Sequence, residues 1–135
     1  MYSNILIPVV FDDGHNTEAS IVAASALADD DARFTVLHVL EAIPSFIAAQ
    51  IPDDLLVKSH DEATRQAEHW AGNLPNASVV VVSGHAGTTI VDYASDNGID
   101  CIVLASHKPG IQNIFLGSTA DRVVRHAKCS VHVIR

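Results

Sequence analysis

Basic residues are scarce in this sequence. Eight lysines and arginines stand against sixteen aspartates and glutamates, which gives a formal net charge of −8 with histidine neutral. The basic residues do not cluster, and nucleic acids and anionic membranes are bound through basic patches, so the composition argues against both classes of partner. It does not exclude a nucleotide, because backbone N–H groups can bind phosphate without basic side chains.

Cysteines and long apolar runs are also few. Cys101 and Cys129 each open a short apolar run, which indicates buried free thiols and not a disulfide framework. No apolar run approaches the length needed to span a membrane. The amino end, Met1 to Asn4, leads directly into a strand pattern without the features of a signal peptide. We therefore expect a cytoplasmic protein that keeps both thiols reduced.

The motifs of common enzyme classes are missing. There is no Walker lysine motif and no GxSxG, and the eight histidines show neither HExxH nor a similar metal-binding spacing. Ser106 and His107 are adjacent, so on a strand their side chains would point to opposite faces and could not work as nucleophile and base. The sequence predicts no catalytic residue, no metal site and no enzyme activity.

The sequence does contain a regular alternation of apolar runs and helical stripes. Its 135 residues, 48% of them hydrophobic, predict one domain over residues 1–135. Four runs predict buried strands: Ile5 to Val10, Phe34 to Leu40, Ser78 to Val82, and Ile99 to Ala105. A fifth strand is predicted over Ser130 to Ile134. The alternating order predicts an α/β fold, a doubly wound five-stranded parallel sheet with helices on both faces.

Helix boundaries are predicted from caps and turn residues. Asn16 or Thr17 is expected to cap the first helix, and the acids that follow it, Asp29 to Asp31, are expected to form a solvated turn. Asp53 or Asp54 is expected to cap the second helix, and the third should start at Thr88 or Thr89, with Gly98 just past its end. The apolar stripe predicted for the first helix consists of Ala19, Val22, Ala23, Ala26 and Leu27.

The segment from Glu41 to Pro52 is predicted as a loop, although it is unusually apolar. It contains Ile43, Phe46 and Ile47. A loop of this length is often functional, so it could cover a ligand or a partner surface. The alternative is that it packs over the end of the sheet.

The stretch from Cys101 to Ala127 has the strand, loop and helix order of an anion-binding site. Gly117 would let a ligand approach the backbone, and Ser118 or Thr119 could cap the following helix. The free N–H groups of that first turn, together with the helix dipole, favour a phosphate. The alternative is a plain turn with an N-cap. In doubly wound sheets ligands bind beyond the carboxyl ends of strands, so the loops Val9 to Gly14 and Ala105 to Gly117 are the candidates.

Four pieces of the chain resemble the universal stress protein family, and the similarity runs over the whole length. They are Ile5 to Val9, Leu37-His38-Val39, Ala105-Ser106-His107 with Gly117-Ser118-Thr119, and Val124 to Val131 with the terminal Val-Ile-Arg. The resemblance implies an intracellular homodimer joined through the last strand and, in many members, bound ATP or AMP. It implies that adenine lies around Pro8, Val9 and Val39, and that ribose and phosphates lie around Ala105, Ser106, His107, Gly117, Ser118 and Thr119.

Three positions depart from the family pattern. The aspartate that usually ends the first strand is Val10 here, and neither Asp12 nor Asp13 aligns with it. The first motif glycine is Ala105, a mild change if its φ is negative. The second is Lys108, which could reach a phosphate as a point charge or could be a solvated loop lysine. The shortened loop resembles a subgroup that binds nucleotide without this glycine.

Three functions are compatible with these patterns. The favoured one is a stress-response or signalling module that binds ATP or AMP, with or without Mg²⁺. The second is a nucleotide-free dimeric interaction protein, which Val10 and Ala105 favour, and the third is a slow ATPase. The last strand, Ser130 to Ile134, should be a sheet edge with few features that block pairing, so we expect a homodimer through it.

Overall fold

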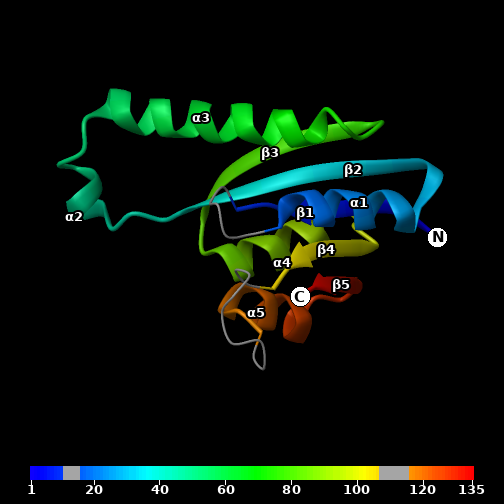
Figure 1. Ribbon diagram of the computed structural model, residues 1–135. Coiled ribbons are helices and arrows are strands. Elements are labelled where there is room, and N and C mark those ends of the chain that lie inside the picture. Colours follow the sequence, from blue (N-terminus) through cyan, green and yellow to red (C-terminus); the bar gives the residue numbers. More distant parts are fainter. Residues whose placement is uncertain (11–15, 107–115) are drawn as a thin grey trace.

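The protein is a five-stranded, all-parallel α/β sheet, as the sequence predicted. The computed structural model describes residues 1–10, 16–106 and 116–135. The strand order is β3-β2-β1-β4-β5, so the chain leaves β1 toward both edges and the sheet is doubly wound (Figure 1). The elements are β1 (Tyr2–Pro8), α1 (Thr17–Leu27), β2 (Ala28–Glu41), α2 (Ser45–Ala48), α3 (Asp53–Ala71), β3 (Ala77–Gly84), α4 (Ala86–Asp96), β4 (Cys101–Ala105), α5 (Ser118–His126) and β5 (Ser130–Ile134).

The core consists of two apolar layers, one on each face of the sheet. Ile5 and Ile7 of β1 face the layer that α1 and α3 cover, and Leu6 faces the layer of α4 and α5. This division follows from the alternation of side chains along a strand. β1 and β4 are buried on both faces, as predicted. The prediction of full burial is wrong for β3, because it is an edge strand and most of its residues are half-buried. β5 is the other edge, as predicted.

The predicted stripe on α1 is confirmed only in part. Ala23 and Leu27 pack against the core as half-buried residues. The fully buried residues of the helix are Ser20, Ile21 and Ala24, whereas Val22 is 63% exposed. Alanine and small residues occur on every side of this helix, so apolar spacing alone does not select the face that meets the sheet. The cap prediction is confirmed at Asn16, whose side chain accepts a hydrogen bond of 3.1 Å from the Ala19 N–H.

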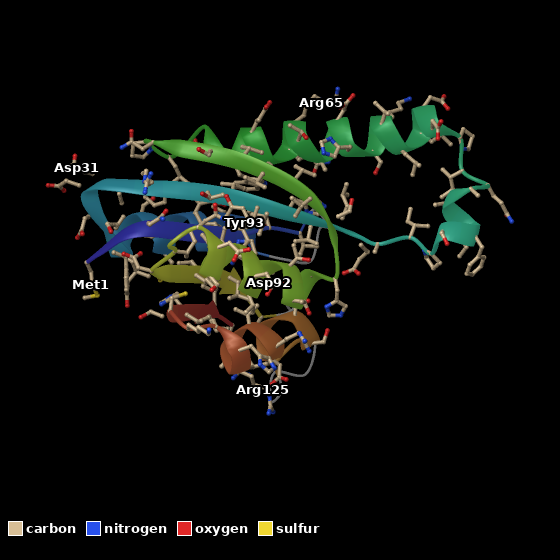
Figure 2. The ribbon with its side chains drawn as sticks, turned by 180° about the vertical axis from the view of Figure 1, so that it is seen from behind. Met1, Asp31, Arg65, Asp92, Tyr93 and Arg125 are labelled. Carbon is tan, nitrogen blue, oxygen red and sulfur yellow. The ribbon has the colours of Figure 1, made fainter. Side chains whose placement is uncertain are left out.

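The three consecutive acids are not a turn. They lie inside β2, which begins at Ala28 directly after α1. The register with β1 shifts between Tyr2 and Asn4, so this irregular start of β2 keeps the acids exposed. Figure 2 shows Asp31 projecting from the same end of the molecule as Met1, and the Met1 amino group pairs with Asp29. Pairing with β1 at Ala28 and again at Arg33 therefore continues the strand across the acids, where local sequence would end it.

The predicted loop between β2 and α3 does not pack over the sheet. Ile43, Phe46 and Ile47 are 43%, 70% and 43% exposed, and Figure 1 shows α2 at the far end of an arm that leads away from the sheet. The packing alternative is wrong for these side chains. A role in covering a ligand or partner stays a prediction.

The N-caps predicted for α3 and α5 and the start predicted for α4 are wrong, since α4 begins at Ala86. The N-caps are Pro52 for α3, His85 for α4 and Gly117 for α5, and none of them makes a side-chain capping bond. Asp53 and Asp54 instead lie in the first turn of α3, where the helix dipole favours acids. The prediction for Gly98 is confirmed, since it follows the α4 cap with a φ of 64°. Among the described helices, none is long and apolar enough to cross a membrane.

A hydrogen-bonded latch joins the amino ends of β1 and β4. The Asp100 carboxylate accepts bonds from the Ser3 N–H at 2.9 Å, the Ser3 hydroxyl at 3.1 Å and the Asn4 N–H at 3.0 Å. The Asn4 side chain donates in turn to the carbonyls of Asn97 and Gly98, each at 3.0 Å. Burial alone would raise the pKa of Asp100, but these bonds together hold it below its ordinary value.

Candidate functional site

A cavity of about 580 Å³ opens at the carboxyl ends of β1, β2 and β4. This is the switch point of the sheet, because β1 has β2 on one side and β4 on the other. The first residues of α1, α4 and α5 complete its wall. Its volume lies within the range of small-molecule sites. The fold therefore forms one pocket from segments that are far apart in the sequence.

Eight of the ten residues predicted for the site line this cavity: Pro8, Val9, Val39, Ala105, Ser106, Gly117, Ser118 and Thr119. The other two, His107 and Lys108, lie outside the described residues. Val10, which stands where an aspartate was expected, also lines the cavity and is 46% exposed. The structure thus brings the end of β1, the end of β2 and the start of α5 to one place.

The entry to α5 is fixed by backbone bonds. Ser106 is buried, its N–H donates to the Ile134 carbonyl at 2.9 Å, and its carbonyl accepts from the Gly117 N–H at 3.1 Å. Gly117 is the N-cap, with φ −62° and ψ 157°, so the predicted caps at Ser118 or Thr119 are wrong. The first N–H groups of a helix have no intrahelical partner, and this applies to the N–H groups of Ser118 and Thr119, which both line the cavity.

Ala105 is a mild change from glycine, as expected. Among the described residues other than glycine, only Asn76 has a positive φ, so Ala105 has an ordinary extended conformation in β4. A glycine is not needed there for backbone reasons.

The ends of β1 and β2 carry the second set of polar groups. The Val9 N–H donates to the Leu37 carbonyl at 2.8 Å. The Val9 carbonyl lies 2.9 Å from Nδ1 of His38, which itself lines the cavity. Glu41 is the other titratable residue among the described lining residues. No group of three or more His, Cys, Asp or Glu in the described ranges could hold a metal ion.

Sequence reasoning missed several lining residues. His38 and Glu41 on β2, and Thr17 and Ser20 on α1, all face the cavity. His38 could have been found from its place beside Val39 at the end of a strand. The two α1 residues follow the loop after β1, but only their position in the folded chain shows that they reach the pocket.

Comparison with known proteins agrees over the whole chain. The sequence model of the universal stress protein family matches residues 1–135. Universal stress protein A homolog 2 of Coxiella burnetii is 29% identical, with 99% of this chain and 95% of that protein covered. The structure of the universal stress protein UspA from Lactobacillus plantarum has a TM-score of 0.76 at 31% identity, covering 99% of this chain and 98% of that one.

A more distant structure shares the fold. The universal stress protein from Archaeoglobus fulgidus, solved in complex with dAMP, has a TM-score of 0.70 at 18% identity and covers 99% of this chain and 98% of that chain. The match of the family model from end to end and the 31% identical structure go beyond a common fold. This chain belongs to the universal stress protein family.

Proposed function

We propose that this protein binds an adenine nucleotide, ATP or AMP, in the cavity at the switch point and acts as a stress-response or signalling module. The observation that carries the proposal is the cavity itself, which joins the ends of β1 and β2 to the start of α5. A base needs a flat apolar slot with a few polar groups, and phosphates need N–H donors. The ends of β1 and β2 supply the apolar slot, and the start of α5 supplies the N–H donors.

In this proposal the base lies against Pro8, Val9 and Val39, and the phosphates lie at the start of α5. Ser118 and Thr119 offer peptide N–H groups and hydroxyls there, and the helix dipole adds favourable charge. Ala105 and Ser106 border the space between the two for the ribose. The dAMP complex of the Archaeoglobus fulgidus protein supports the proposal to the extent that the shared fold accommodates an adenine nucleotide.

We propose binding without a chemical step. The described lining residues supply N–H donors, hydroxyls and an apolar slot, which are sufficient for binding. Mg²⁺ would come with ATP and be held mainly by the phosphates. A catalysed hydrolysis would show as steady phosphate release that a pocket variant abolishes, and we expect none.

We also propose that two copies pair through β5. The Ser106 N–H donates to the Ile134 carbonyl, so the peptide groups of Ile134 and His132 face β4. Peptide groups alternate sides along a strand, so those of Val131 and Val133 face outward. Within the described chain β5 is a sheet edge. A second β5 across a two-fold axis would satisfy these outward groups in both copies.

The direct test is the small-molecule content of freshly purified protein, followed by calorimetry with ATP and AMP. Mass spectrometry after denaturation should find an adenine nucleotide. Gly117→Val should weaken ATP binding about tenfold or more, roughly 1.4 kcal/mol, because a branched side chain would stand at the phosphate end. Gly72→Val is the matched control, since Gly72 ends α3 with a similar φ of −60° and does not line the cavity.

The outcomes separate the alternatives. Loss of affinity in the Gly117 variant but not in the Gly72 variant supports the site. Equal ATP affinity in all three proteins means that the nucleotide binds elsewhere. A wild type that carries and binds no adenine nucleotide favours a nucleotide-free interaction protein.

A further inference from the structure

The hydrogen-bonded ladder between β1 and β2 stops one rung early. Its last registered pair is Pro8 with Leu37. The next rung would pair Val9 with His38, through a bond from the Val39 N–H to the Val9 carbonyl. The register does not include that pair. The Val9 carbonyl instead lies 2.9 Å from the His38 ring.

The direction of the Val39 peptide groups follows from its neighbours. The Leu37 carbonyl accepts from the Val9 N–H, so Leu37 turns its backbone groups toward β1. The Ala42 N–H donates to the Gly84 carbonyl at 3.2 Å, so the even-numbered residues of this strand face β3. By alternation Val39 faces the β1 side. There β1 has already ended and the cavity, which Val39 lines, begins.

The hydrogen bond from the His38 ring therefore takes the place of the peptide hydrogen bond that a continued ladder would form with the Val9 carbonyl. A carbonyl oxygen can only accept, so the contact requires the proton on Nδ1 of His38. This bond satisfies the Val9 carbonyl from a side chain. The Val39 N–H is then left out of the ladder.

We propose that His38 is a positioning residue for base recognition, an inference that rests on the proposed nucleotide site. By occupying the Val9 carbonyl, His38 leaves the N–H and C=O of Val39 directed at the pocket. One donor and one acceptor side by side match the N1 acceptor and N6 amino donor of adenine. Hypoxanthine presents the reverse pattern, so the same strand end should prefer ATP over ITP.

The first test needs no nucleotide. Amide hydrogen exchange is followed by NMR in wild type, His38→Asn and His38→Leu. In the wild type and the Asn variant, whose side-chain amide can replace Nδ1–H, the Val39 amide should exchange quickly. In the Leu variant this amide is expected to bond to the Val9 carbonyl. Its exchange should then be slower than in the wild type by a factor of about ten or more. The Leu37 amide, which lies within the ladder, is the internal control and should stay slow in all three proteins.

The second test is calorimetry with ATP and ITP. Wild type and His38→Asn should bind ATP within about threefold of each other and prefer it over ITP. His38→Leu should bind ATP about fivefold to tenfold more weakly, the effect of one hydrogen bond, with little change for ITP. Loss of selectivity for the base is a result that general damage to the fold would not give.

The outcomes distinguish this inference from the proposed function. A wild type that binds neither nucleotide refutes the proposed function and with it the base-recognition role. A Val39 amide that is already slow in wild type, or a Leu variant with unchanged preference for ATP, overturns the role of His38 alone. If the Leu variant does not fold, His38→Gln replaces it. The glutamine side chain places its N–H groups at the Nε2 position of histidine and not at Nδ1, so this variant should behave like the Leu variant. Hydrogen exchange and base preference equal to those of the wild type would also overturn the inference.

Discussion

Replacing Asp100 with asparagine should lower the free energy of unfolding at pH 7 and much less in acid. The carboxylate accepts three hydrogen bonds from Ser3 and Asn4. A hydrogen bond to a charged group contributes about 1.5–3 kcal/mol when it is buried. Asp100 is only half-buried, so water competes for these donors. Asparagine also keeps one acceptor oxygen, and we therefore expect a loss of about 1 kcal/mol, or about 3 °C in Tm.

The dependence on pH follows from the direction of the pKa shift. The pKa of Asp100 is lower in the folded protein than its ordinary value of about 3.9. Its stabilisation is complete above the unfolded pKa and disappears as the pH falls through the folded pKa. The difference between wild type and variant should be full at pH 7 and smaller at about pH 3, below the ordinary pKa.

The assay is urea unfolding at both pH values and one fixed protein concentration. Asp31→Asn is the control, because Asp31 is an exposed acid of β2 (Figure 2), and it should change stability by less than about 0.5 kcal/mol. An Asp100 variant as stable as wild type at pH 7, or one that loses equal stability at both pH values, would refute the reasoning.

Two further predictions concern β5 and the cysteines. Val133→Pro should shift a wild-type dimer toward monomer in sedimentation while keeping its circular dichroism, because it removes only an outward N–H. His132→Pro removes an N–H that faces β4 and should destabilise the fold itself, and a wild type that sediments as a monomer at tens of micromolar would contradict the pairing. Burial raises the pKa of the Cys101 thiol to about 11 and also raises that of Cys129. Cys101 should therefore react with Ellman's reagent about 100-fold more slowly in the native protein than after denaturation, and Cys129 should also react more slowly. Denatured protein should yield two free thiols, and finding none would be inconsistent with the reduced pair of Cys101 and Cys129.

The sequence by itself determined the fold class. The uninterrupted apolar runs at Ile5 to Ile7 and Cys101 to Leu104 require strands buried on both faces, and they are the centre of the sheet. Local chemistry also fixed the cap at Asn16 and the left-handed residue at Gly98. Each of these features depends on residue types within one short segment, so the sequence of that segment is enough to predict it.

The tertiary structure decided what depends on neighbours. Pairing of Ala28 and Arg33 with β1, on either side of Asp29 to Asp31, kept the acids within a strand, although three consecutive acids favour a turn. Contact with the sheet selected one face of an alanine-rich α1. At the site, the residues around Gly117 could be predicted from their motif, but the contact of His38 with Val9 could not. Whether a peptide group is paired depends on where the adjacent strand ends, and that is known only once the strands lie side by side.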